Sequence, residues 1–329
     1  MPYLFELGFK GKIYSTSATI EQTIQVLTSL KTKTKYFETI DHLSRRTWIT
    51  LLFGSGIEFQ YGYSGHTLGS VWYLFRINKE QIYFSGDYST ESPILLTEQP
   101  IVEKPIDIAI LDGAYGKETR SQQSYLHEIY ETIEQARKIK RKVLIHGPMY
   151  GKLQDLLISL LENKPDLFSE TVISQDMKAS FAAYINAPAN VKKKARLHFK
   201  RYSNFVKTES LINWLRISKF SIGLFSEQEV LKNFTKTDNL LILCTGPFLQ
   251  DLVHVVNKHD TIDYEQKRYK VHPCVNELHE QMKRLQPKKV IFTHNSNEQM
   301  ISLQETFTEL GEDVALVQVG EVLETITTT

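Results

Sequence analysis

The order of predicted strands and helices along the chain is the feature that most limits its fold. Runs with period-two or fully apolar character, typical of short strands, recur in the first third: KIYSTS, RTWITLLF, IEFQYGY, SVWYLFRI, QIYFSGDY and IDIAILDG. Between the first two runs, TIEQTIQVLTSLKTK has apolar residues at helical spacing, with Thr19 as its N-cap candidate. The first third is therefore predicted to be a strand-rich layer crossed by a helix.

From about Ser121 the pattern changes to the helix–strand alternation of an α/β unit. Helical periods cover residues 121–142 and 151–164, and apolar runs predict strands at 142–147, 180–187, 220–226 and 239–246. The last stretch predicts helix, strand, helix and strand at 276–286, 288–294, 297–312 and 313–321. With 329 residues, the chain is expected to form two α/β domains, or one large domain that carries an insertion.

Composition narrows the class of protein. Hydrophobic residues make up 41% and charged residues 23%, and no long apolar run occurs, so we expect a soluble globular protein without membrane partners. The first residues carry no readable secretory signal, which makes the cytoplasm the expected location. The two cysteines, Cys244 and Cys274, are too few for a disulfide framework and are expected to be reduced.

One segment is rich in basic residues although the net charge is only +1. Residues 191–207 mix cations with Phe199, Tyr202 and Phe205, which suits phosphate contacts combined with base stacking. The cations of this segment are Lys192, Lys193, Lys194, Arg196, Lys200 and Arg201. The alternative is a solvated basic helix face with no nucleic-acid partner.

Histidines and aspartates occur where predicted strands end or begin. His66 precedes SVWYLF, Asp87 follows IYFSG, Asp112 follows IAIL and His294 follows VIFT, while His272 lies in YKVHPCVNEL. Side chains at strand ends can converge on one edge of a sheet. Imidazole and carboxylate together suit zinc or manganese, although each residue taken singly is more often a turn residue or a hydrogen-bonded structural group than a ligand.

The ordered set of motifs resembles the β-CASP branch of the metallo-β-lactamase superfamily, a group of RNA- and DNA-processing nucleases. GFKGKIYSTSAT is similar to the family's G-F-x-G-x-I-Y-x-T segment, GHTLGS to its third metal motif and FSGDY to its fourth. ILDGAYG, VHPCVNEL and LQPKKVIFTHNS are similar to its motifs A, B and C. Six segments in the family's order are a far more specific signal than any one of them.

The resemblance implies a metallo-β-lactamase αββα sandwich interrupted by an α/β β-CASP insertion. We expect residues 1–119 to form the first part of the sandwich, 120–268 the insertion and 269–329 the C-terminal part. The implied activity is metal-dependent hydrolysis of phosphodiester bonds in RNA or single-stranded DNA, and a homodimer is the implied assembly.

The resemblance also implies a role for each motif residue. His66 would bind a first zinc or manganese ion, Asp87 would bridge two ions, and His294 would bind the second. Asp112 would orient a metal-binding histidine, and His272 would stabilise charge on the scissile phosphate or protonate the leaving oxygen.

The family's H-x-H-x-D-H segment does not occur in these 329 residues, and the chain opens on the part that follows it in relatives. Asp41-His42 is the nearest substitute and is interpreted as a turn or cap. We therefore expect an N-terminally truncated sandwich that binds metal weakly by itself. Three hypotheses follow: an active nuclease completed by a separate chain or segment, an inactive pseudoenzyme that binds nucleic acid or protein, or a truncated remnant.

Overall fold

Two compact units make up the chain. The computed structural model describes residues 2–26, 36–50, 56–103, 105–202, 206–235, 237–246, 249–256 and 261–315. Unit 1 comprises residues 1–90, 97–119 and 272–329, and unit 2 comprises residues 91–96 and 120–271. The short segment 91–96 and residues 269–271 thus cluster with unit 2, whereas the sequence placed them with the first and last parts of the sandwich.

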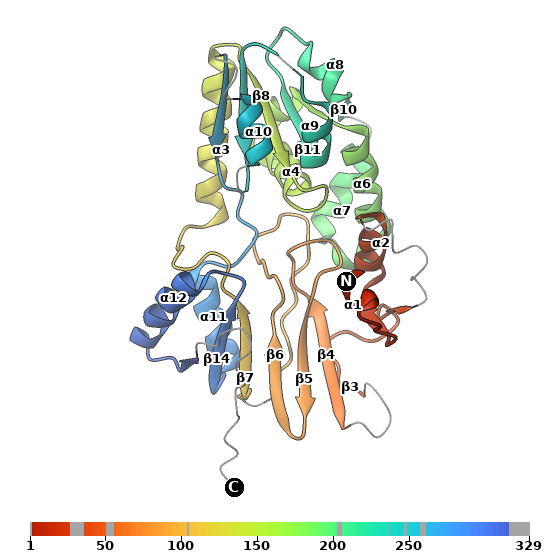
Figure 1. The fold of residues 1–329 in the computed structure, drawn as a ribbon, viewed down its shortest axis with the longest axis vertical. Coiled ribbons are helices and arrows are strands. Elements are labelled where there is room, and N and C mark those ends of the chain that lie inside the picture. The colour runs from red at the N-terminus through yellow and green to blue at the C-terminus, as the bar shows by residue number, and fades with distance from the viewer. Residues whose placement is uncertain are drawn as a thin grey trace. The chain divides into compact units, whose positions relative to one another are not determined.

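Unit 1 is built on a seven-stranded mixed sheet, ordered β15-β14-β7-β6-β5-β4-β3 (Figure 1). Its strands are β3 (Ile49–Thr50), β4 (Ile57–Tyr63), β5 (Val71–Ile77), β6 (Glu80–Phe84), β7 (Ile108–Asp112), β14 (Lys289–Thr293) and β15 (Val314–Ala315). Strands β3 to β6 pair antiparallel, whereas β6, β7, β14 and β15 pair parallel. A separate parallel pair joins β1 (Ile13–Ser15) to β2 (Phe37–Thr39). The strand predicted at residues 288–294 is β14, and it pairs with β7 although the whole of residues 120–271 lies between them in the sequence. An interrupted sandwich requires this pairing.

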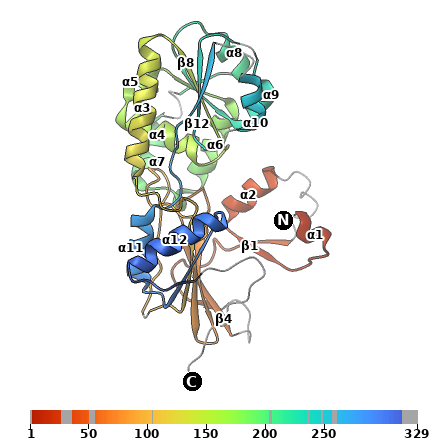
Figure 2. The same ribbon diagram turned by 60° about the vertical axis from the view of Figure 1, so that its left-hand side comes forward.

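Alternation along β5 gives the unit-1 sheet two apolar faces. Trp72 and Leu74 are buried against helices α11 (Val275–Leu285) and α12 (Asn297–Glu309). Tyr73 and Phe75 point the other way and pack with Ile40 and its aromatic neighbours. Helices α11 and α12 lie together at the β14 side of the sheet, away from α1 (Pro2–Glu6) and α2 (Ser17–Val26) (Figures 1 and 2).

Unit 2 is a parallel sheet ordered β10-β9-β11-β8-β12-β13. Its strands are β8 (Lys142–Gly147), β9 (Thr171–Ile173), β10 (Lys207–Thr208), β11 (Ile222–Ser226), β12 (Leu240–Cys244) and β13 (Ile262–Gln266). Its helices are α3 (Gln122–Lys138), α4 (Lys152–Asn163), α5 (Pro165–Ser169), α6 (Gln175–Asn186), α7 (Lys193–Tyr202), α8 (Leu211–Leu215), α9 (Glu227–Asn233) and α10 (Gln250–Val256). The central strands are buried along their whole length, as expected where helices cover both faces of a parallel sheet.

The segment 91–96 is held in unit 2 by hydrogen bonds. Ser92 donates its hydroxyl hydrogen to Asp155 Oδ1 at 3.0 Å, and Lys192 donates its Nζ hydrogen to the Ser92 carbonyl at 2.6 Å. Backbone bonds join Lys192 N to Ile94 O and Leu96 N to Asn190 O, each at 2.8 Å. Asn190 and Val191 are therefore buried, while Pro188 and Ala189 before them and Lys193 and Lys194 after them stay exposed.

The strand predicted at residues 180–187 is wrong, because this segment belongs to helix α6. The helix begins after Ser174, whose side chain accepts a hydrogen bond from Met177 N at 3.0 Å. Met177, Phe181 and Tyr184 then lie on one buried face at helical spacing. The strand prediction used only the apolar run at residues 180–187, whereas the helical spacing becomes visible only when Met177, which precedes that run, is included.

A smaller correction concerns the start of helix α2. Its N-cap is Thr16, whose hydroxyl oxygen accepts a hydrogen bond from Thr19 N at 3.3 Å, and not Thr19 itself. The predicted continuation through Leu27 and Leu30 lies outside the described residues. Within the described ranges, no helix is both long enough and apolar enough to cross a bilayer.

Candidate metal centre

His66 lies in the tight loop that joins β4 to β5. The loop closes through a hydrogen bond from Ser64 N to Ser70 O at 3.0 Å. Gly65 has a φ of +75°, and a Cβ there would lie 2.3 Å from the Ser89 carbonyl oxygen. Only glycine fits this position, so the backbone before His66 is fixed by its contact with the chain around Ser89.

Asp87 follows β6 and lies next to the His66 loop. The Ser64 hydroxyl donates to the Asp87 carbonyl oxygen at 2.7 Å, which joins the two loops. The His66 Nε2 atom lies 3.5 Å from Asp87 Oδ2. The Asp87 side chain is 47% exposed, so its carboxylate can reach a ligand that arrives from solvent.

Asp112 is the last residue of β7 and is almost completely buried. Its Oδ2 accepts hydrogen bonds from Tyr88 N at 3.0 Å and from His272 Nδ1 at 2.7 Å, and its Oδ1 accepts one from Ala114 N at 3.1 Å. Burial opposes the charge of this carboxylate, but the hydrogen bond and charge of His272 and the backbone N–H donors outweigh it. The pKa of Asp112 therefore lies below its ordinary value.

His272 lies just before α11 and is held by Asp112. Because the carboxylate accepts from Nδ1, the Nδ1 atom carries the hydrogen and Nε2 stays available for another contact. The imidazole meets Tyr115 edge-on at a ring-centroid distance of 5.1 Å. The rings of His66 and His294 also lie close, at 4.6 Å and 4.9 Å. Three imidazoles from distant parts of the sequence thus share one small volume.

His294 follows β14 with a φ of +73°, a left-handed conformation that is rare outside glycine. Strand β14 pairs parallel with β7 so that Thr293 is opposite Asp112, which places His294 one residue beyond the edge of the sheet. Its Nδ1 lies 3.2 Å from Asp87 Oδ1 and 3.3 Å from Asp112 Oδ1. The strained backbone accompanies a side chain aimed between two carboxylates.

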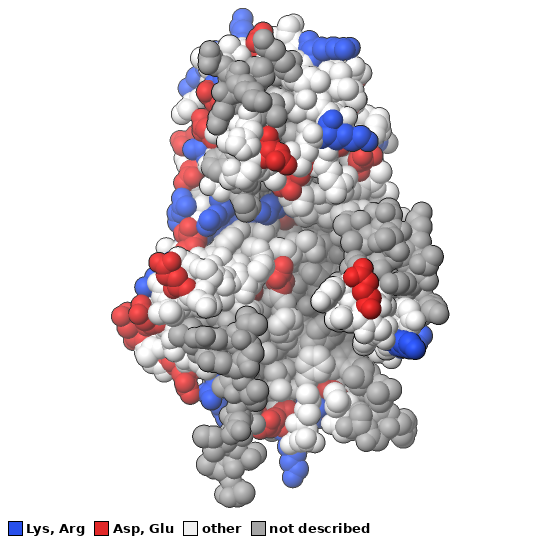
Figure 3. Space-filling view, in the orientation of Figure 1, with Lys and Arg blue, Asp and Glu red and all other residues white. Residues whose placement is uncertain are grey.

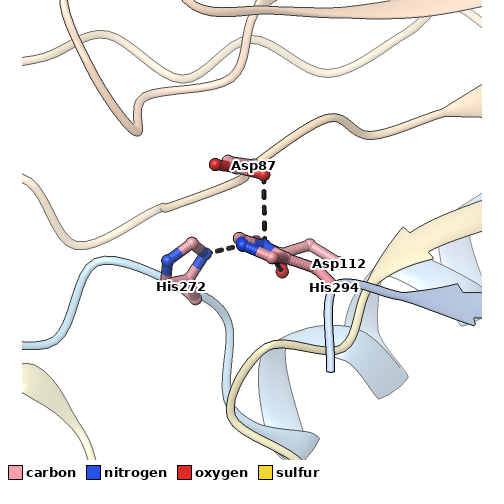
Figure 4. A group of neighbouring side chains, drawn as sticks. All are labelled: Asp87, Asp112, His272 and His294. Carbon is pink, nitrogen blue, oxygen red and sulfur yellow. Dashed lines mark hydrogen bonds and ion pairs between the residues drawn. The ribbon is translucent and has the colours of Figure 1, made fainter. Parts of the chain in front are cut away.

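Asp87, Asp112, His272 and His294 form one group in which one possible ligand atom from each lies within 4.8 Å of the others. Figure 4 shows the four side chains pointing toward one another from separate chain segments. Two carboxylates and two imidazoles suit zinc or manganese, so this donor set fits a metal ion of the kind the sequence predicts. His66 stands beside the group through its contact with Asp87.

The five residues singled out from the sequence therefore lie together, but two details were not foreseen. Asp112 was expected to orient a metal-binding histidine, and its shortest contact is to His272. Tyr115 was not assigned a role, although it packs against the His272 ring. Its position three residues after Asp112 was a usable signal, since a residue so near a strand end stays at the same edge.

The predicted nucleic-acid surface on α7 has the expected exposed cations but lacks the expected exposed ring of Phe199. Lys193, Lys194 and Arg196 are exposed on α7, and Lys194 Nζ lies 2.8 Å from Glu162 Oε1. Phe199 is only 4% exposed and packs against Phe181 and Tyr184, so the prediction that it stacks on a base is wrong. The side chains of Lys200, Arg201 and Tyr202, and the whole of Phe205, lie outside the described part of the chain.

The face drawn in Figure 3 shows cations and anions interspersed, without one extended basic field. This agrees with a net charge of +1 and means that any polyanion would be held by local contacts. The prediction for residues 193–201 therefore depends on the few cations of α7 alone.

Comparison with known proteins identifies relatives of the chain. No family model matches it. It is 21% identical to endoribonuclease YSH1 of Candida glabrata over 232 residues, which is 60% of this chain and 30% of the relative. It is 25% identical over 169 residues to ribonuclease TTHA0252 of Thermus thermophilus, covering 49% of this chain and 39% of that one. Against cleavage and polyadenylation specificity factor 73 of Drosophila melanogaster it is 23% identical over 219 residues, with coverages of 56% and 30%.

The chain is a relative of the β-CASP metallo-β-lactamase nucleases. The predicted family and the predicted mixed α/β fold are thereby confirmed. The match covers less than two-fifths of the length of each β-CASP relative named here. The activities of those whole proteins therefore bear on this chain only through the segments that it shares with them.

Proposed function

We propose that this chain is part of a metal-dependent nuclease that hydrolyses phosphodiester bonds in RNA. The observation that carries the proposal is the close group of Asp87, Asp112, His272 and His294, in which one donor atom from each residue lies within 4.8 Å of the others, with His66 in contact with Asp87. Support for the substrate comes from the relatives, two of which are named as an endoribonuclease and a ribonuclease. Single-stranded DNA is the alternative substrate.

We assign His66, Asp87 and His294 as the ligands of zinc or manganese. Asp87 is the natural bridging group, because His66 contacts its Oδ2 and His294 contacts its Oδ1. When bound, such ions polarise a phosphoryl oxygen and lower the pKa of a bound water. The strained backbone at His294 and the fixed turn at His66 keep these side chains in place before any metal arrives.

We assign His272 as the residue that acts on the phosphodiester itself, with Asp112 as its positioning residue. Asp112 accepts the Nδ1 hydrogen and leaves Nε2 to hold or release a proton at the leaving oxygen. The edge-on contact with Tyr115 limits rotation of the His272 ring. We assign the cations of α7, among them Lys193 and Arg196, to secondary contacts with the RNA backbone.

The proposed ligands are too few to hold two ions tightly. Three protein ligands shared between two ions leave each ion with about two, whereas a zinc site uses three or four. No H-x-H-x-D-H sequence occurs in the 329 residues. We therefore propose that the remaining ligands come from a further segment or a separate chain, and that these 329 residues alone hydrolyse RNA poorly. If the chain never binds metal, the two remaining hypotheses are a pseudoenzyme that only binds RNA or protein and a truncated remnant.

The test is the metal content and RNA cleavage of the purified chain, alone and co-expressed with a segment that carries H-x-H-x-D-H. We expect about two zinc or manganese ions per chain only in the co-expressed sample, and their loss in His294→Ala. His127→Ala, which changes an exposed histidine on α3, is the matched control and should keep both metal and activity. Absence of metal from both samples, or cleavage that His294→Ala leaves intact, would contradict the proposal.

A further inference from the structure

Unit 2 contains an apolar cavity that the nuclease proposal does not use. Its volume is about 190 Å³, and it lies among helices α4, α5, α6 and α7 and strand β9. Leucine, isoleucine and phenylalanine side chains form most of its wall, for example Leu157, Phe181 and Phe199. Because dispersion contacts are lost wherever such a wall has no partner atoms, a cavity of this kind gains from an apolar occupant.

The cavity opens along one face of α6. Lys178, Ala182 and Ile185 line the cavity and are also exposed to solvent. They are four and three residues apart, so they form one stripe along the helix. The stripe therefore marks the mouth, while Leu157 and Phe181, which are buried, mark the interior.

The mouth carries one cation that no anion of the described residues neutralises. Lys178 makes no ion pair within the described ranges, and its aliphatic stem can lie on the apolar rim while its ammonium group stays in water. The nearby carboxylate of Glu162 is already occupied, by Lys194 at 2.8 Å and by His198 at 3.2 Å. His198 also lines the cavity. Because Glu162 is paired with both Lys194 and His198, its negative charge repels a carboxylate bound at the mouth less than an unpaired glutamate would.

We propose that this cavity is a binding site for a small amphipathic carboxylate, with its apolar body inside and its carboxylate at Lys178. An engineered apolar cavity of about 150 Å³ binds benzene, so a cavity of 190 Å³ takes a body of roughly six to eight non-hydrogen atoms. A short fatty acid or an aromatic acid meets both conditions. The inference uses only unit-2 residues and is independent of the proposed metal centre.

The experiment titrates the full chain with hexanoate and follows backbone amide shifts by two-dimensional NMR. We expect saturable shifts confined to the elements that line the cavity, which are helices α4, α5, α6 and α7 and strand β9 with the residues next to them. Ala182→Phe places a ring at the mouth and should weaken hexanoate at least ten-fold, while circular dichroism shows that the chain stays folded. Lys178→Gln should weaken hexanoate roughly three-fold and leave hexanol unchanged, as expected for a partly exposed ion pair.

Lys232→Gln is the matched control, because Lys232 is an exposed lysine on α9, another unit-2 helix, and does not line the cavity. It should leave both probes unaffected. Shifts elsewhere in the chain, or hexanoate binding that survives Ala182→Phe, would overturn the site. Equal loss of hexanoate and hexanol in Lys178→Gln would overturn the role of the carboxylate.

Discussion

Asp112 is the residue on which the geometry of the candidate centre depends most. One oxygen of its carboxylate holds the Nδ1 of His272 and the other lies near the Nδ1 of His294, so a single buried group positions two imidazoles. Its charge is kept by His272 and by two backbone N–H donors in spite of burial. Loss of that charge should therefore affect both histidines together.

Asp112→Asn should weaken zinc binding by the complete site 10- to 100-fold, because an amide can present its NH₂ group to Nδ1 of His294, a proposed zinc ligand, and so favour the wrong tautomer of that ring. The measurement is zinc competition against a chromophoric chelator. Asp166→Asn, at an exposed position on α5, is the control and should not change zinc affinity. Equal zinc affinities of Asp112→Asn and the unmodified chain would show that Asp112 has no such role.

Asp155 is a second buried carboxyl, in unit 2. Burial raises its pKa to about 7, although the hydrogen bond from Ser92 and the charge of Lys192 act in the opposite direction. Tyr184 and Tyr269 lie near enough to interact with it electrostatically. The folded chain therefore prefers the protonated form of Asp155 at pH values where the unfolded chain ionises it.

The free energy of unfolding should consequently fall as the pH rises from about 4 to about 7, by at most about 1.4 kcal/mol per pH unit from this group. Below pH 4 both states are protonated and the contribution is complete. Asp155→Asn should be more stable than the unmodified chain at pH 8 and show a flatter profile between pH 5 and 8. Urea denaturation across that range measures both, and parallel profiles would contradict the assignment.

At the scale of elements, short turns fix the strand ends that carry the site. Gly65 adopts a φ of +75° while its backbone touches the chain around Ser89 and Thr97. Gly8 also has a positive φ, of +86°, but a Cβ there would meet nothing within 4 Å. The two glycines differ only in whether space is available for a side chain, which makes them a matched pair.

Gly8→Ala should cost only the left-handed conformation, about 1 kcal/mol. Gly65→Ala should cost distinctly more, about 3 kcal/mol in total, because its Cβ must displace the Ser89 carbonyl and the Thr97 side chain. Urea denaturation of both variants gives the comparison. Similar losses of stability in the two variants would mean that the loop before His66 is adaptable.

The sequence predicted an element correctly wherever its apolar residues followed a single periodicity, either that of a strand or that of a helix. Apolar and polar or small residues alternate along IEFQYGY, and this alternation predicted β4 with its observed limits, although the structure buries Gln60 and Gly62 as well. Helix α6 was predicted as a strand because the helical signal of Met177 and its cap Ser174 lay outside the apolar run. Strand ends also predicted which five side chains meet in unit 1. Which histidine Asp112 binds could not be predicted, because hydrogen-bond partners depend on side-chain directions that spacing does not determine.

At the scale of the whole molecule, the chain passes between its two units at residues 90–91, 96–97, 119–120 and 271–272. An inserted domain that is entered once and left once can be removed with two cuts and moved to another protein. Here residues 120–271 taken alone would leave Asp155 without Ser92, and Asn190 and Lys192 without their backbone partners. Residues 120–271 are therefore not a complete domain by themselves. A gene rearrangement that transfers unit 2 intact must also carry residues 91–96, which lie between two segments of unit 1 in the sequence.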